Sequence, residues 1–169
     1  RDSLTKLLNR GATQSSIDTY LEQRAPNAMA AMLVLDLDNF KSVNDTRGHM
    51  CGDAVLTQVG VLLRKLVRSN DIIGRIGGDE FLVFLKDIPS TNILEERCRL
   101  LLDSLRAAFD SIMPDPHISC SIGVSLAPAH GTTYNLLFQH ADEALYYVKS
   151  HQKDSYRFYD PQNLYTPYM

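Results

Sequence analysis

Apolar residues follow two different periods along this chain. Residues 29–35 form a continuous apolar run that ends at Asp36, which is typical of a strand buried on both faces of a sheet. Elsewhere apolar residues recur every three or four positions, as they do in an amphipathic helix. This spacing predicts four helices, at residues 12–24, 53–68, 94–109 and 137–148, and a shorter helix is expected near residues 39–46.

The remaining apolar segments predict strands. Residues 72–76 and 81–85 are short runs joined by the letters GGDE, the pattern of a β-hairpin. Residues 117–127 predict a longer strand, and residues 156–159 predict an edge strand. The order β-α-α-β-β-α-β is that of a ferredoxin-like fold with one additional helix. We therefore expect an α/β (α+β) fold in which helices flank a central, mainly antiparallel sheet of five strands.

Length and composition indicate one globular domain. The 169 residues suffice for a single sizeable core, and 44% hydrophobic and 22% charged residues are ordinary proportions. A net charge of −3 argues against a general nucleic-acid binder, and no apolar run approaches the ~20 residues of a membrane span. The three cysteines form no CxxC pair, so we expect reduced thiols and a cytoplasmic domain. Because the chain starts at Arg1 rather than Met, we expect residues 1–169 to be one domain of a longer signalling protein, which leaves membrane attachment through other regions open.

Four acidic residues stand at the ends of predicted strands. Asp36 and Asp38 follow the first strand, and Asp79 and Glu80 lie in the turn of the hairpin. If the first strand is central and lies beside the hairpin, these acids gather at one edge of the sheet, where oxygen ligands suit Mg²⁺. The alternative is that Asp38 and Glu80 are solvated loop acids and that their clustering in the sequence is accidental.

The glycines of the hairpin have two interpretations. Gly77 and Gly78 serve turn geometry alone, or they let a phosphate approach the backbone closely. Taken by themselves, the two glycines favour turn geometry. The two acids that follow them directly weaken that interpretation. Other phosphate and metal motifs are absent from the sequence: there is no GxxxxGK[ST] or GxGxxG loop, no EF-hand and no histidine–cysteine spacing for zinc.

Three motifs in order resemble the GGDEF domain of bacterial diguanylate cyclases. They are the opening DSLTKLLNR, then DLDNFKSVNDTRGHMCGD, and finally RIGGDEF. The similarity extends from Asp2 to about Lys153, which is nearly the whole chain. It implies a ferredoxin-like palm related to nucleotide cyclases and polymerases. It also implies condensation of two GTP molecules into cyclic di-GMP with release of pyrophosphate, by two domains that face each other as a homodimer.

The resemblance also implies a role for individual residues. One or two Mg²⁺ or Mn²⁺ ions would be held by Asp36, the carbonyl of Leu37, Asp79 and Glu80, and Asp79 would be the candidate base for the attacking 3′-hydroxyl. The catalytic residues would be Asp79, Glu80 and Lys41, of which the lysine contacts phosphate. The substrate would be contacted by Phe40, Asn44, His49, Asp53, Gly77, Gly78, Lys149 and Lys153.

Elementary chemistry agrees with the expected choice of nucleotide. Guanine presents two adjacent N–H donors that the carboxylate of Asp53 can accept, and the amide of Asn44 can both donate and accept. Adenine lacks that donor pair, so the site should prefer GTP. The plain alternatives are that Asn44 is a turn residue, that Asp53 caps the helix at its N-terminus, and that the lysines are solvated surface charges. A triphosphate needs compensating cations, however, because an acidic cluster alone would repel it.

A second motif, RSND, precedes the hairpin. Arg68 and Asp71 stand at the spacing that binds product and inhibits the enzyme in relatives, and Arg99 is a candidate second arginine. The alternative is a helix-end arginine with a turn aspartate.

The chain departs from relatives after its last helix, where GRN is replaced by QKD at residues 152–154. Asp154 adds an acid that is expected to weaken phosphate contact. This departure leaves room for a rival function, a non-catalytic module that senses GTP or cyclic di-GMP. A purely structural dimerisation domain is a third option.

Overall fold

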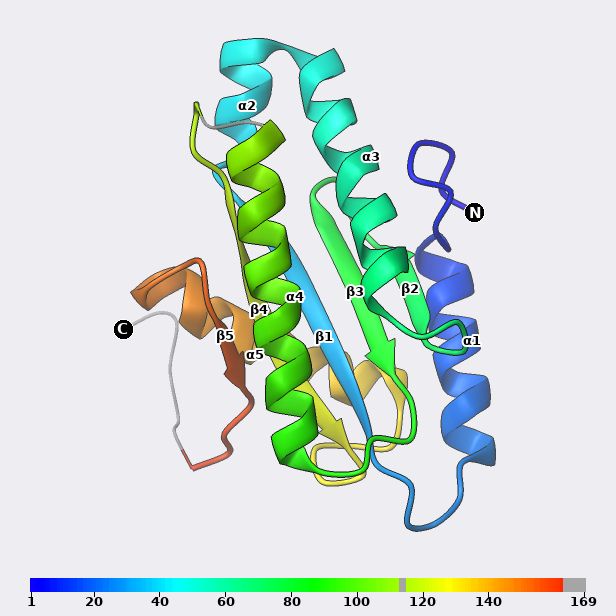
Figure 1. The fold of residues 1–169 in the computed structure, drawn as a ribbon. Helices are drawn as coiled ribbons and strands as arrows, with labels where there is room; N and C mark the ends of the chain where they lie inside the picture. The colour runs from blue at the N-terminus through cyan, green and yellow to red at the C-terminus, as the bar shows by residue number, and fades with distance from the viewer. Residues whose placement is uncertain (113–114, 163–169) are drawn as a thin grey trace.

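A single twisted sheet of five strands organises the molecule, with helices on both of its faces (Figure 1). The computed structural model describes residues 1–112 and 115–162. Within these ranges no helix is long and apolar enough to cross a membrane. The helices are α1 Arg10–Gln23, α2 Phe40–Arg47, α3 His49–Leu66, α4 Thr91–Ile112 and α5 Tyr134–His151; the strands are β1 Ala30–Asp38, β2 Ile72–Arg75, β3 Glu80–Leu85, β4 Ser119–Ala127 and β5 Tyr156–Phe158.

The strand order β2-β3-β1-β4-β5 places β1 at the centre of the sheet. β1 pairs antiparallel with β3 and β4, β2 pairs antiparallel with β3, and β4 and β5 pair in parallel. The expected ferredoxin-like order and the mainly antiparallel sheet are thereby confirmed, as is the hairpin around GGDE.

Alternation along β1 decides which face each side chain enters. Its odd-numbered apolar residues, from Ala31 to Leu37, join the core between the sheet and helices α3 and α4. Its even-numbered residues, Ala30, Met32 and Val34, join the core beneath α1 and α5. Since side chains in a strand alternate between faces, Asp36 and Asp38 belong to the same face as α5.

Several boundaries differ from the sequence-based prediction, and two of them bear on the predicted site residues. β1 continues through Asp38 instead of ending near Leu35, because hydrogen bonding to β4 extends to the pair Asp38 and Ser119. Helix α3 begins at His49, one turn before the predicted start at Asp53. The interpretation of Asp53 as the helix N-cap was therefore wrong: Gly48 occupies that position, with a φ of 89° that favours glycine.

Candidate active site

Asp36 of β1 and Glu80 of β3 are directly paired across the sheet. Paired residues of adjacent strands project from the same face, so the two carboxylates are neighbours. The backbone N–H of Leu37 donates to the carbonyl of Asp79 at 3.2 Å, which joins the hairpin turn to the central strand. Acids from two stretches more than forty positions apart in the sequence therefore meet at one end of the sheet, as predicted.

Positive charge compensates Asp36 and Glu80 only in part. Burial raises the pKa of Asp36 to about 6, although the nearby Lys149 ammonium opposes the shift. Burial, with the carboxylate of Asp36 as the next contribution, raises the pKa of Glu80 to about 7. Both carboxyl groups thus have a deficit of positive charge around them, and a divalent cation would relieve it.

The donors at this end of the sheet fit magnesium or manganese. Among residues 1–112 and 115–162 no three His, Cys, Asp or Glu side chains are grouped as a complete metal site. Mg²⁺ does not need such a group, because it usually takes one or two carboxylates and completes its shell with water and substrate phosphates. The carboxylates of Asp36, Asp79 and Glu80, with the Leu37 carbonyl, are oxygen donors of that kind.

Asp38 has a different environment from the other acids. It is 1% exposed, and it accepts hydrogen bonds from the hydroxyls of Ser119 at 2.6 Å and Ser121 at 2.8 Å. The alternative in which Asp38 and Glu80 are solvated loop acids was wrong, because both lie in strands and Asp38 is buried. Hydrogen bonds from the serines and Lys149 lower the pKa of Asp38 against the effect of its burial, so it remains a carboxylate.

Lys149, from the last turn of α5, lies between two of the aspartates. Its Nζ is 2.9 Å from Oδ1 of Asp38 and 3.6 Å from Oδ1 of Asp36. A cation therefore lies beside the candidate metal ligands, at the edge where phosphates would meet the sheet. Lys153 is exposed on the turn that follows α5.

A hollow of about 370 Å³ opens beside the hairpin. It brings together residues that the sequence assigned to the substrate, contributed by α2, α3 and the GGDE turn. Its lining consists of Phe40, Lys41, Asn44, His49, Asp53, Leu56, Arg75, Gly78 and Asp79. Such a space, with the amide of Asn44 and the carboxylate of Asp53 on its wall, suits a planar base with several hydrogen-bonding groups.

Gly52 makes room for Asn44, a relationship that sequence reasoning missed. A Cβ added at Gly52 would collide with Oδ1 of Asn44. The glycine of the GHMCGD segment thus lets the side chain of Asn44 lie against α3, facing the same hollow as Asp53.

Neither glycine of the hairpin has the left-handed backbone that would require glycine. Positive φ values occur at Gly48 and Gly131 among the described glycines, not at Gly77 or Gly78. A Cβ added at Gly78 would meet nothing within 4 Å. Because turn geometry does not demand glycine at position 78, close approach of a ligand becomes the better explanation for it.

Arg75 supports the hairpin turn and was also missed. Its Nε and Nη2 donate to the carbonyl of Gly78 at 3.1 Å and 2.7 Å, and its Nη1 donates to Asp2 at 3.1 Å. Asp2 in turn accepts from the backbone and hydroxyl of Thr5. The signal was present in the sequence, because Asp2 and Arg75 belong to the first and last of the three motifs.

The RxxD residues form a closed ion pair in this structure. Asp71, whose side chain is fully buried, accepts from Nε and Nη2 of Arg68 at 3.2 Å and 3.1 Å and from the N–H of Lys86 at 3.0 Å. The second arginine beside it is Arg97, at 3.5 Å. Arg99, the expected second arginine, lies near Tyr156 instead, and its part in product binding stays a prediction.

A second hollow, of about 390 Å³, adjoins this ion pair. Four basic residues contribute to its wall, Arg1, Lys6, Arg64 and Arg68, together with Asp71. The positive charge of this surface suits an anionic ligand.

Asp154, the residue that departs from relatives, does not direct its charge at the active site. Its carboxylate pairs with Arg106 of α4 at 3.0 Å. The expected weakening of phosphate contact by this acid stays a prediction, and the ion pair with Arg106 offsets part of its negative charge.

Comparison with solved structures places the fold among GGDEF domains. The GGDEF domain of TpbB (YfiN) from Pseudomonas aeruginosa matches with a TM-score of 0.78 and 31% identity over 95% of this chain and 94% of that chain. A sensory box/GGDEF family protein from Caulobacter crescentus matches with a TM-score of 0.80 and 34% identity, over 89% of this chain and 97% of that chain. The GGDEF domain of DgcB from the same organism, solved with cyclic di-GMP, matches with a TM-score of 0.77 and 25% identity, over 93% of this chain and 94% of that chain.

Curated relatives are longer proteins with different names. The cyclic di-GMP phosphodiesterase PdeR of Escherichia coli is 36% identical over 95% of this chain, which spans 24% of that protein. The diguanylate cyclase DgcS of Shewanella oneidensis is 35% identical over 92% of this chain and 51% of its own length. The family model described as "Diguanylate cyclase, GGDEF domain" matches residues 1–155. The chain therefore belongs to the GGDEF domain family of diguanylate cyclases.

Proposed function

We propose that this domain is an active diguanylate cyclase that condenses two GTP molecules into one cyclic di-GMP and two pyrophosphates. The observation that carries the proposal is the pairing of Asp36 with Glu80, which Asp79 of the same turn connects to a hollow that contains Asn44 and Asp53. A metal-binding pair of acids and a base-sized space with guanine-type partners are the two parts that the reaction requires.

The nucleotide is held at two ends. Asn44 and Asp53 recognise the guanine edge, with Phe40 and His49 beside the base and Gly78 leaving the backbone open. The phosphates are held by the cationic side chains of Lys41, Lys149 and Lys153, and they approach the backbone of the hairpin turn at Gly77.

Divalent metal completes the site. GGDEF cyclases generally depend on a divalent metal. Mg²⁺ or Mn²⁺ would be held by Asp36, the Leu37 carbonyl, Asp79 and Glu80, and when bound it would stabilise charge on the α-phosphate and the leaving pyrophosphate. Asp79 accepts the proton of the 3′-hydroxyl as that oxygen attacks the α-phosphorus of the other GTP.

Two domains must act together. Each attack forms one phosphodiester bond and breaks one α–β phosphoanhydride bond, so two attacks between two nucleotides close the ring and release two pyrophosphates. We expect this hollow to bind one nucleotide per domain, which implies a homodimer with the two sites facing each other. In a longer protein, an upstream sensor or regulatory domain would control that encounter.

The RxxD site is proposed to bind cyclic di-GMP and inhibit. The second hollow and its basic wall support this, with Arg97 in the place earlier given to Arg99. Arg68 would have to release Asp71 before either could bind the product, since the two are paired with each other.

One observation favours the rival, a binding module without turnover. A relative named as a phosphodiesterase matches over 95% of this chain, so the domain also occurs in proteins that are not named as cyclases. The rival predicts affinity for GTP or cyclic di-GMP without product formation.

The test is an incubation of purified protein with GTP and Mg²⁺, followed by chromatography of the nucleotides. It is run on the isolated domain at high concentration and on a fusion to a dimerising coiled coil, with Asp36→Asn as the inactive control. Cyclic di-GMP from the fusion but not from the Asp36→Asn fusion supports the proposal. If the isolated domain and the parent fusion both leave GTP intact, and calorimetry still shows that they bind GTP or cyclic di-GMP, the result selects the binding module instead.

A further inference from the structure

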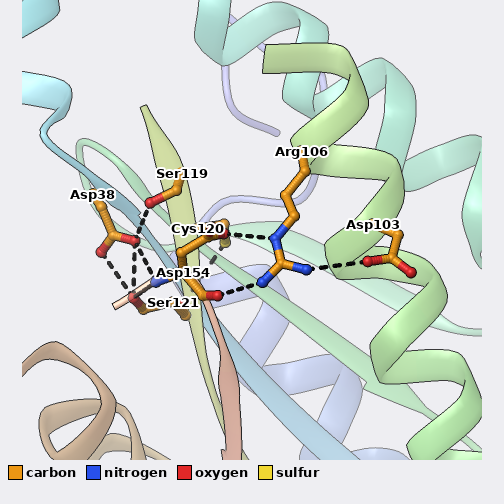
Figure 2. Close-up of polar contacts among 7 residues, drawn as sticks. All are labelled: Asp38, Asp103, Arg106, Ser119, Cys120, Ser121 and Asp154. Carbon is orange, nitrogen blue, oxygen red and sulfur yellow. Dashed lines mark hydrogen bonds and ion pairs between the residues drawn. The ribbon is translucent and has the colours of Figure 1, made fainter. Parts of the chain in front are cut away.

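A chain of hydrogen bonds joins the active-site strand to the opposite face of the sheet (Figure 2). It begins at the buried Asp38 of β1. Oδ2 of Asp38 accepts from Ser119 and Ser121 and from the backbone N–H of Asp154, the last at 3.1 Å. Oδ1 accepts from Ser121 and lies 2.9 Å from Nζ of Lys149. Hydrogen bonds at Oδ2 thus fix the carboxylate of Asp38, and its Oδ1 forms the ion pair that positions Lys149.

The turn that supplies the Asp154 N–H has an unfavourable backbone. Lys153 and Asp154 have φ values of 54° and 47°, in the left-handed region. This region is unfavourable for non-glycine residues, so other contacts must hold the turn. The N–H of Asp154 also lies 3.2 Å from the hydroxyl of Ser121, which makes the position of this amide matter to two partners of the network.

Arg106 of α4 holds that turn from the other side. Its Nε donates to Oδ1 of Asp154 at 3.0 Å and its Nη2 donates to the carbonyl of the same residue at 2.6 Å. Figure 2 shows the guanidinium bound to both the side chain and the backbone of Asp154, with Asp103 as a separate partner of Nη1. A residue fixed through both its carboxylate and its carbonyl cannot rotate its N–H away from Asp38 without breaking these bonds.

We propose that Arg106 and Asp154 are positioning residues for the phosphate-binding Lys149, and that they act through the N–H of Asp154 and the carboxylate of Asp38. Neither touches the nucleotide. The inference rests on the proposed function, because it takes Lys149 as a ligand of the outer phosphates. It gives the QKD departure a structural role, because Asp154 supplies the carboxylate that Arg106 binds.

The test compares two probes on Arg106→Gln and the parent domain. One probe is the GTP analogue with a methylene between the α- and β-phosphates, which cannot release pyrophosphate; the other is GMP, which lacks the outer phosphates. Both are titrated calorimetrically with Mg²⁺. We expect the variant to bind the analogue about three- to tenfold more weakly, the effect of one displaced charged contact, and GMP as well as the parent does.

Asp103→Asn is the matched control. It removes the remaining ion-pair partner of the same arginine at 3.1 Å without touching Asp154, and it should leave both affinities unchanged. Asp154→Asn, which keeps the backbone N–H and loses the carboxylate, should shift analogue affinity in the same direction by a smaller factor. This second variant decides the matter if Arg106→Gln fails to fold.

Three results would overturn the inference. Analogue affinity could stay at the parent value in Arg106→Gln and Asp154→Asn, or analogue and GMP affinity could fall by the same factor, which indicates a general disturbance. If the parent domain binds neither probe, the proposed function fails and takes this inference with it. Failure of the inference alone is recognised by a parent that binds the analogue and variants that bind it equally well.

Discussion

Asp36 and Glu80 are cross-strand partners on the two adjacent central strands, with their carboxylates on one face at the end of the sheet. Like charges placed opposite each other on neighbouring strands are destabilising. Burial of both increases that cost, as their raised pKa values show. An arrangement that is unfavourable for the empty protein and favourable around a cation is what a metal-dependent site requires.

Removal of either acid should abolish turnover. We expect Asp36→Asn and Glu80→Gln each to reduce kcat by about a hundredfold or more, because charge stabilisation at the transferring phosphate is lost. The measurement is the initial rate of cyclic di-GMP formation, with Asp110→Asn, an exposed change on α4, as the control. Turnover within about threefold of the parent in Asp36→Asn would remove the metal role of this residue.

The metal-free domain should lose stability as the pH rises. The pKa of Asp36 is raised to about 6 and that of Glu80 to about 7, so the folded state holds these protons more tightly than the unfolded chain. Their stabilising contribution is therefore present at acidic pH and is lost as the pH rises through these values. Tm measured in chelator should fall less for Glu80→Gln than for the parent between about pH 5 and about pH 8. Parallel curves would contradict the assigned pKa shifts.

Gly78→Ala should separate binding from folding. A Cβ at this position meets nothing within 4 Å and the backbone is not left-handed, so Tm should be unchanged. We expect GTP affinity to fall about tenfold or more, because the methyl group occupies space needed by the nucleotide. Gly131→Ala is the control with the opposite pattern, since its φ of 147° makes alanine unfavourable far from the hollow. Unchanged GTP affinity in Gly78→Ala would show that position 78 is not a substrate contact.

Base selectivity should depend on Asn44 and Asp53. Asp53→Ala and Asn44→Ala should each lower the ratio of GTP to ATP affinity by about tenfold or more, because guanine donors and acceptors lose their partners. Gly52→Ala should have the same effect indirectly, since its Cβ would displace the Asn44 side chain. Selectivity measured by competition titration that survives all three changes would place guanine elsewhere.

Product inhibition should depend on Arg97 and not on Arg99. Arg97 lies 3.5 Å from Asp71, whereas Arg99 contacts Tyr156. We expect Arg68→Ala and Arg97→Gln to raise the half-inhibitory concentration of cyclic di-GMP by about tenfold, with Arg99→Gln unchanged. A raised half-inhibitory concentration in Arg99→Gln, with Arg97→Gln unchanged, would support the sequence-based assignment of Arg99.

The parts of the fold that could be predicted from sequence are those with a strong local signal. The apolar run before Asp36 marked the central strand, and the GGDE letters between two apolar runs marked the hairpin. Local signals failed where a polar residue belongs to a regular element. Asp38 continues β1 because Ser119 and Ser121 of a strand more than eighty residues away satisfy it. The start of α3 was missed because apolar spacing becomes regular only at Val55, six positions after His49.

The candidate site divides in the same way. The family motifs indicated the acids of the candidate metal site, and they also indicated Asn44 and Asp53 as guanine-binding residues. They gave no indication that Arg97 instead of Arg99 faces Asp71, because both flank the buried Cys98 and the choice depends on how α4 is rotated against the sheet. The bond between Arg106 and Asp154 joins residues 48 positions apart that no local pattern relates.

The most direct measurement is the anomalous difference map of a crystal grown with Mn²⁺ and the methylene analogue of GTP. We expect a manganese peak at the carboxylates of Asp36 and Glu80, with guanine against Asn44 and Asp53. A nucleotide bound without metal at these carboxylates, or guanine outside that hollow, would contradict this expectation.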